Sequence, residues 1–202
     1  MPSAADQVSA AIVAADGAIP FNQFMQLALY GDAGFYTTTG QAGRRGGDFI
    51  TSPEVGPLFG TVIAGYLDDC WEKLGSPSRF DVVECGAGPG TLARSILAAK
   101  PRCLQAMNYV AVEVSAAQRA LHPKGVESRE RMPDHAINGV ILANELLDNL
   151  PFRLFVFDGA WMEAFVAQTP DGAFVEVLHK PTDLPAVLPQ AAVLGSRIPI
   201  QD

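Results

Sequence analysis

The sequence has few cysteines and no long apolar run, and both shortages narrow the kind of protein it encodes. Its three cysteines, Cys70, Cys85 and Cys103, lack the spacing of metal ligands or of a redox pair. They therefore predict free thiols in a reducing compartment, which we take to be the cytoplasm. No apolar stretch approaches the length of a membrane span, and residues 1–6 have neither the basic flank nor the apolar core of a signal peptide. We expect no membrane partner.

Basic residues are also scarce. The chain has 14 lysines and arginines against 22 acidic residues, a formal net charge of −8, and no basic block. Such a balance argues against a nucleic-acid groove, which needs positive charge. The histidines, His122, His135 and His179, are scattered singly, so no metal site is predicted. By contrast, hydrophobic residues make up 49% of 202 residues, which is enough for a globular domain with a sizeable core.

The stretch of residues 81–92 is the most informative part of the sequence. Val82 and Val83 are apolar and β-branched, which predicts a buried strand. Three glycines at two-residue spacing follow, namely Gly86, Gly88 and Gly90. They let a ligand approach the backbone closely. A helical apolar repeat begins at Thr91, and the free N–H groups at its start favour an anionic ligand group. Together they predict a nucleotide-binding corner.

The spacing of this turn bears on which nucleotide it would bind. In a dinucleotide fingerprint, G-x-G-x-x-G, the third glycine would stand where this sequence has Thr91. Glu84 lies two residues before the first glycine, where it would repel a pyrophosphate and attract an ammonium group. These features favour S-adenosylmethionine (SAM) over NAD. A NAD-dependent oxidoreductase and a turn that binds nothing remain the alternatives.

A second strand is predicted at residues 108–114. It contains an acid, Glu113, at the place where nucleotide-binding α/β folds accept hydrogen bonds from ribose hydroxyls. Ser115 can cap the next helix. The alternative for Glu113 is a solvated acid at a strand end.

The apolar residues 139–143 predict another buried strand. It leads directly into Asn144, Glu145 and Asp148. Ligands of open α/β sheets bind beyond the carboxyl ends of the strands. We therefore expect these three side chains where a reacting substrate meets the cofactor.

The remaining pattern predicts three regions. Residues 1–75 hold helices at 4–15, 21–30 and 58–74, with a glycine-rich loop at 31–57. We interpret residues 47–55 as lying over the binding corner, with an ordinary surface connection as the alternative. Residues 76–151 form the core, with further helices at 91–100 and 115–122 and a weak strand at 125–129. Residues 152–202 predict an antiparallel meander, with strands at 154–157, 161–168 and 174–178, followed by a proline-rich tail.

Four stretches, residues 47–54, 84–91, 112–115 and 143–151, occur in the order of a known family. They resemble the SAM-dependent methyltransferases related to the MidA-type complex I assembly factor, known as protein arginine methyltransferases. The match runs from about residue 21 to about residue 201. The glycine motif is generic to SAM enzymes, whereas G-D-F-I-T-S-P-E and N-E-L-L-D-N-L-P are specific.

The resemblance implies a fold, a cofactor, a substrate and a site. The fold is α/β, with a Rossmann-like class I core of about four parallel strands, an N-terminal helical segment and a C-terminal antiparallel meander. The cofactor is SAM, and the substrate is an arginine-containing protein. The implied cofactor-binding residues are Ser52, Pro53, Glu84, Gly86, Ala87, Gly88, Gly90, Thr91 and Glu113. The implied catalytic residues are Asn144, Glu145 and Asp148.

One departure from the family concerns length. In the family the chain continues well beyond this point, and residues 197–201 resemble the beginning of a later helix. We therefore expect a partial sheet with one uncovered edge, and marginal stability for the isolated chain. A non-catalytic, partner-binding relative of the methyltransferases is the alternative function. Self-association of identical copies stays open.

Overall fold

The computed structural model describes residues 2–38 and 56–201. The chain divides into two compact units. One consists of residues 39–147, and the other joins residues 1–38 with residues 148–202. The three-part division made from the sequence stays a prediction.

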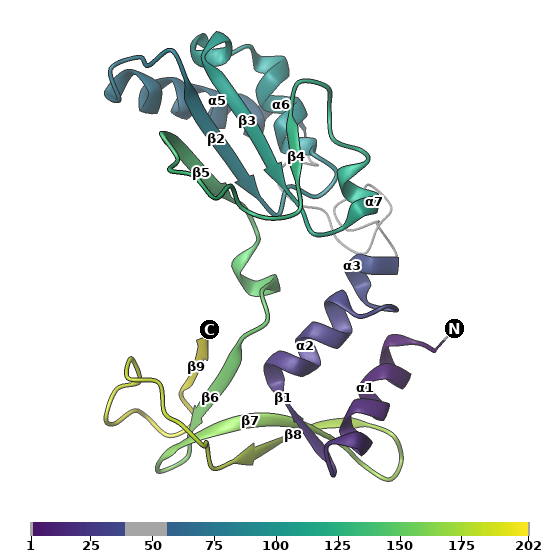
Figure 1. Ribbon diagram of the computed structural model, residues 1–202. Helices are drawn as coiled ribbons and strands as arrows, with labels where there is room; N and C mark the ends of the chain where they lie inside the picture. Colours follow the sequence, from purple (N-terminus) through teal and green to yellow (C-terminus); the bar gives the residue numbers. More distant parts are fainter. Residues whose placement is uncertain (1, 39–55, 202) are drawn as a thin grey trace. The chain divides into compact units, whose positions relative to one another are not determined.

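The unit of residues 39–147 is built on a parallel sheet with the strand order β4-β3-β2-β5 (Figure 1). Its strands are β2 (Phe80–Cys85), β3 (Met107–Val112), β4 (Glu127–Arg129) and β5 (Gly139–Ala143). All three pairings are parallel, and Cys85 at the end of β2 lies opposite both Val112 and Ala143. The predicted four-stranded parallel core is confirmed.

The helices α5 (Pro57–Lys73) and α6 (Thr91–Ala99) cover one face of this sheet, as Figure 1 shows. Their apolar side chains, among them Leu67 and Ile96, join a buried cluster with Phe80 and Val82 of β2. Val83 points to the other face, where it packs with β3 residues. The alternation of buried side chains on β2 follows from the two-residue period of a strand. Within residues 2–38 and 56–201, no helix is long and apolar enough to cross a bilayer.

The short elements of this unit connect the strands. They are η1 (Arg102–Gln105), a 3₁₀ turn before β3, and α7 (Ala116–Arg119), which Ser115 caps with its side chain. The helix expected over 115–122 is thus a single turn, since its later residues form a turn before Pro123. β5 lies at one end of the strand order, and Ile141 in it is exposed. Ile141 lies opposite Val83, on the face away from α5 and α6. The expected uncovered edge stays a prediction.

The second unit contains an antiparallel sheet with β7 (Trp161–Gln168) at its centre. β8 (Phe174–His179) pairs with one side of β7, and β6 (Arg153–Phe157) and β1 (Ala18–Pro20) pair with the other. The predicted meander of three strands is confirmed. Three helices complete the unit: α1 (Ala4–Ala14), α2 (Phe21–Tyr30) and α3 (Phe35–Thr38). The 3₁₀ turn η2 (Leu147–Asn149) lies at the boundary between the units.

The prediction that a helix begins at residue 197 is wrong. Residues Arg197–Ile200 form β9, which pairs antiparallel with β6. The alternation of exposed and half-buried residues in β9 fits a strand. Pro199 lies on this outer strand of the sheet, which is where proline is tolerated. β1, only three residues long, was likewise not predicted.

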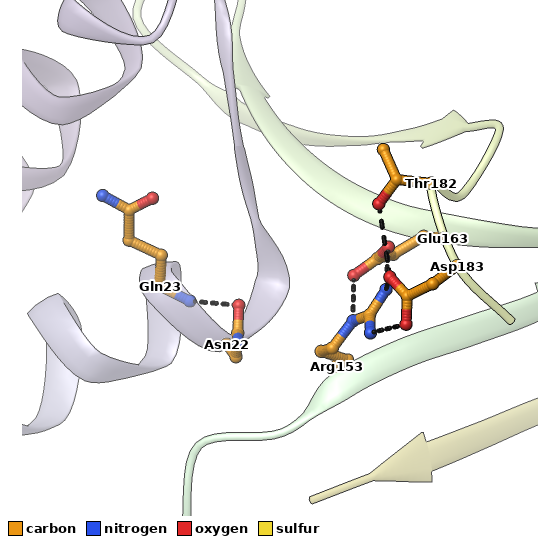
Figure 2. Close-up of polar contacts among 6 residues, drawn as sticks. All are labelled: Asn22, Gln23, Arg153, Glu163, Thr182 and Asp183. Atoms are coloured by element: carbon orange, nitrogen blue, oxygen red, sulfur yellow. Dashed lines mark hydrogen bonds and ion pairs between the residues drawn. The ribbon is translucent and has the colours of Figure 1, made fainter. Parts of the chain in front are cut away.

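An ion-pair network ties the segment before β9 to the sheet (Figure 2). Arg153 of β6 donates from Nε and Nη2 to the two carboxylate oxygens of Glu163 on β7, each over 2.7 Å. It also contacts both oxygens of Asp183, at 3.0 and 3.2 Å. The side chains of Arg153 and Glu163 are 14% and 7% exposed, whereas that of Asp183 is 68% exposed. The guanidinium of Arg153 lowers the pKa of Asp183.

Because Glu163 is buried and Asp183 is exposed, the two ion pairs of Arg153 should contribute unequally to the free energy of unfolding. Arg153→Met leaves the buried Glu163 charge unpaired, so we expect a loss of about 3–5 kcal/mol in the free energy of unfolding. Asp183→Asn breaks only the exposed pair and should cost much less. Urea unfolding followed by circular dichroism measures both. Adding Glu163→Gln to Arg153→Met should recover much of the loss; equal effects of the two single changes would contradict the assignment.

Candidate functional site

Three strand ends meet at one edge of the parallel sheet. Gly86 follows β2, Glu113 follows β3 and Asn144 follows β5. Because Cys85 lies opposite both Val112 and Ala143, the residues after these strands leave the sheet at the same level. The register therefore brings the glycine turn, the predicted ribose acceptor and the segment from Asn144 together.

The three glycines of the turn have different surroundings. A Cβ atom on Gly86 would lie 2.8 Å from Cδ1 of Leu146, so the segment after β5 packs directly on the turn. A Cβ atom on Gly90, which caps α6 with a φ of 77°, would lie 2.9 Å from Cδ of Pro123. Gly88 has a φ of 53°, but a Cβ atom there would meet nothing within 4 Å. Gly88 is thus the glycine with open space beside it.

Ala87 and Thr91 are the other two residues of the turn that the sequence predicted at the site. Ala87 is buried, and its N–H donates to the carbonyl of Val112 over 3.1 Å, which joins the turn to the end of β3. Thr91 is half-buried and begins α6. α6 begins at Thr91, three residues after the open Gly88, which is where the sequence predicted the helix to start.

The Glu113 carboxylate is held by backbone N–H groups on both sides. Gly88 N donates to Oε2 over 3.0 Å, and Ser115 N donates to Oε1 over 2.8 Å. A carboxylate has about four lone-pair positions, so each oxygen can accept a further hydrogen bond. Glu113 is half-buried and is thus oriented to receive donors such as a pair of hydroxyl groups.

Glu84 lies at the end of β2 and is almost completely buried, with 5% of its surface exposed. Its Oε2 accepts a hydrogen bond of 2.8 Å from the hydroxyl of Tyr109. Burial raises the pKa of Glu84 to about 7; the Tyr109 hydrogen bond and the charge of Arg94 lower it, and Glu113 raises it. A buried carboxyl group with a raised pKa is a recurrent feature of functional sites. It would be stabilised by a cationic ligand group.

Glu145 has an unusual backbone. Its φ is 51°, in the left-handed region that non-glycine residues rarely adopt, and its side chain is exposed. Such a conformation costs on the order of 1 kcal/mol and tends to occur at functional sites. Asn144, which precedes it, is half-buried. Both residues belong to the unit of residues 39–147 and lie next to Leu146, which contacts the glycine turn.

Asp148 belongs to the other unit, where it is exposed in η2. Its neighbour Asn149 donates from Nδ2 to Asp148 Oδ1 over 3.5 Å. Two tyrosines hold Asn149: Tyr30 donates to its backbone oxygen over 2.8 Å, and Tyr36 donates to its Oδ1 over 2.9 Å. The two rings stack with centroids 5.5 Å apart. Sequence reasoning missed these tyrosines, because no local pattern connects residues more than a hundred positions apart.

The predictions about Ser52, Pro53 and metal binding remain to be placed. Ser52 and Pro53, expected at the cofactor, lie outside the described residues. Within the described ranges, no group of three or more histidine, cysteine or acidic side chains could hold a metal ion.

Comparison with known proteins identifies the family. A family model described as "Putative S-adenosyl-L-methionine-dependent methyltransferase" matches residues 62–198. The Drosophila melanogaster protein arginine methyltransferase NDUFAF7 homolog, mitochondrial, is 33% identical over 85% of this chain and 46% of its own length. The human protein arginine methyltransferase NDUFAF7, mitochondrial, is 37% identical over 40% of this chain and 18% of its own length.

The names of these relatives contradict the expected cytoplasmic location, since both are mitochondrial proteins. The expectation was wrong because it depended on unpaired cysteines. Free thiols indicate a reducing environment but do not distinguish one reducing compartment from another.

Two solved structures from Burkholderia thailandensis are also similar. A COG1565 superfamily member bound to S-adenosyl-homocysteine superimposes with a TM-score of 0.77 at 30% identity, over 90% of this chain and 50% of that chain. A second superfamily protein gives a TM-score of 0.69 at 31% identity, over 89% of this chain and 48% of that one.

These matches confirm the predicted Rossmann-like fold, and for the family they confirm the predicted cofactor. The chain spans about half the length of the Drosophila relative and of the two solved structures. Since the family model covers more than half of this chain, the chain belongs to this family of S-adenosyl-L-methionine-dependent methyltransferases.

Proposed function

We propose that the protein transfers a methyl group from SAM to an arginine side chain of a protein substrate. The observation that carries the proposal is the arrangement around Gly88. An open glycine lies in a turn that a buried acid, Glu84, precedes, and the backbone-oriented acid Glu113 contacts it. Each acid matches a different donor group of SAM.

The residues present fit SAM. The buried Glu84 carboxyl group, with its pKa near 7, would pair with the ammonium group of the methionine part. The Glu113 carboxylate, with both oxygens oriented by N–H groups, would accept hydrogen bonds from the ribose hydroxyls. Val114, next to Glu113, exposes 60% of its surface and would offer an apolar contact to the base. The space beside Gly88 leaves the backbone accessible to the ligand.

When bound, SAM supplies a methyl group attached to a good leaving group, the sulfonium sulfur. The substrate guanidinium is protonated at any working pH, so the enzyme must both align it and localise its charge. We assign this task to the carboxylate of Glu145, with Asn144 as an orienting amide; the predicted role of Asp148 stays a prediction from the sequence. Transfer would exchange the S–CH₃ bond for an N–CH₃ bond, with the sulfur leaving as a neutral thioether and one proton passing from the attacked nitrogen to water. The product is a methylated guanidinium.

The substrate class draws support from the relatives. Those reported above are named protein arginine methyltransferases. The net charge of −8 also suits a basic substrate, because opposite charges attract at a distance. The strained backbone of Glu145 supports a functional role for this residue.

A methyl-transfer assay tests the function. With radiolabelled SAM and a library of arginine-containing peptides, the protein should produce methylarginine, identified by mass spectrometry. Glu145→Gln should lower the rate by about 10²–10³-fold, because the substrate charge loses its partner, with SAM affinity changed by at most a few fold. Asp134→Asn, a change at a fully exposed acid of the same unit, is the matched control and should leave the rate unchanged. Binding of SAM without any transfer would favour the non-catalytic alternative.

Gly88→Val tests the cofactor site. The valine side chain would occupy the open space beside the turn and would be strained at a φ of 53°, so SAM binding measured by calorimetry should be lost. Gly125→Val is a matched control, because Gly125 also has a positive φ and open space around it but lies just before β4. Unchanged SAM affinity of the Gly88 variant would refute the cofactor assignment.

Glu84 predicts a pH dependence of stability without ligand. Because its folded-state pKa, about 7, exceeds the ordinary value of 4.5, the ionised form is disfavoured in the folded state. Protonated Glu84 therefore contributes to the free energy of unfolding. This contribution is full below pH 4.5 and is lost as the pH rises through 7. Glu84→Gln cannot ionise and should not show this loss. Between pH 4.5 and 8, the free energy of unfolding of the wild type should therefore fall by about 3 kcal/mol relative to that of the variant, as measured by urea unfolding.

A control separates this effect from the general pH response of the chain. Glu130 lies in the same unit with its side chain 61% exposed, and Glu130→Gln should follow the wild-type pH profile. Parallel profiles for wild type and Glu84→Gln would count against a buried, raised-pKa acid at the end of β2.

A further inference from the structure

The backbone on either side of the Gly88 Cα atom is held by two different side chains. Gly88 N donates to Oε2 of Glu113 over 3.0 Å, and Gly88 O lies 2.9 Å from Nε2 of His122. A carbonyl oxygen can only accept, so Nε2 of His122 carries the proton in this contact. The buried Nδ1 atom of His122 has no hydrogen-bond partner among the described residues. The contact to Gly88 O is thus the hydrogen bond that His122 makes through its ring.

The segment that carries His122 is tied to the turn at further points. Arg94 of α6 donates from Nη2 to the carbonyl of Pro89 over 2.8 Å and from Nη1 to that of Leu121 over 2.9 Å. The Cα atom of Gly90 faces Pro123 and His122 so closely that no Cβ atom would fit. Residues 121–123 thus form a fixed support against which the turn rests.

The turn hydrogen bond from Gly90 N to Ala87 O spans Gly88, but Gly88 has no side chain of its own to hold its two peptide groups in place. A glycine with no contact on its Cβ side can adopt many φ and ψ values at little cost. The hydrogen bond to Glu113 fixes the peptide group before Gly88, and the hydrogen bond from His122 fixes the one after it. Without the second contact, the Gly88 N–H could turn away from Glu113, and the carboxylate would lose one of its two orienting donors.

We propose that His122 is a positioning residue of the cofactor site. By donating from Nε2 to Gly88 O, it fixes the Gly88 backbone and, through Gly88 N, the Glu113 carboxylate that receives the ribose hydroxyls. This role rests on the proposed function, since it concerns the same cofactor. It explains why a histidine without metal-ligand spacing lies against the glycine turn, 34 positions along the chain from Gly88.

Calorimetric titration with S-adenosyl-homocysteine tests the hydrogen bond. His122→Leu removes the donor and leaves Gly88 O without its partner, so affinity should fall about tenfold. His122→Gln can place an amide N–H at the position of Nε2 and should bind within about threefold of wild type. His122→Asn has an amide too short to reach and should resemble the leucine variant, which keeps the test decisive if His122→Leu does not fold. His135→Leu, in the same unit, should bind like wild type.

A double-mutant cycle with Glu113→Gln tests the route through Glu113. If His122 acts by orienting that carboxylate, His122→Leu should weaken binding by less than about twofold in the Glu113→Gln background. A purely structural role would give the full tenfold loss in both backgrounds, and this additive result would overturn the proposal. So would equal affinity of wild type and His122→Leu, or equally weak binding of His122→Gln and His122→Leu. A wild type that does not bind the probe would instead refute the proposed function.

Discussion

The parallel register of β2 with its two neighbours is the constraint on which the candidate site depends. Cys85 lies opposite both Val112 and Ala143, so the chain leaves all three strands at the same edge. A slip of one residue would turn every side chain of a strand to the other face. The burial of Val82 with α5 and α6, and of Val83 on the opposite face, opposes such a slip. The core packing that stabilises the sheet therefore also places Glu84 and the glycine turn.

Two buried acids on the same strand have pKa values shifted in opposite directions, because their hydrogen-bond partners differ. Both Asp81 and Glu84 are buried in β2. Burial raises the pKa of Asp81, but hydrogen bonds from Asn108, Asn138 and Arg79 outweigh it and lower the pKa below its ordinary value. At Glu84 burial prevails and the pKa rises to about 7. Asp81 is satisfied within the protein, whereas Glu84 would gain from a cationic partner. Only the second arrangement suits a ligand.

Long, strongly patterned elements could be predicted from the sequence, and short ones paired over long distances could not. The helix α5 and the meander β6 to β8 were predicted because each contains enough periodic residues to show its own pattern. β1 and β9 contain three and four residues, and their partners lie far along the chain, as with Ala18 opposite Ala167. A strand this short has too few residues to reveal its period, so the partner decides its conformation.

The sequence by itself determined the chemical signature of the site: an acid before three glycines, an acid after the second strand, and the Asn144 to Asp148 segment. These signals are local, because a turn or a strand end needs particular residues at fixed offsets. Only the tertiary structure decided which glycine has open space, how deeply Glu84 is buried, and that His122 supports Gly88. Burial, pKa and hydrogen-bond partners depend on segments that meet only after folding, so no local pattern encodes them.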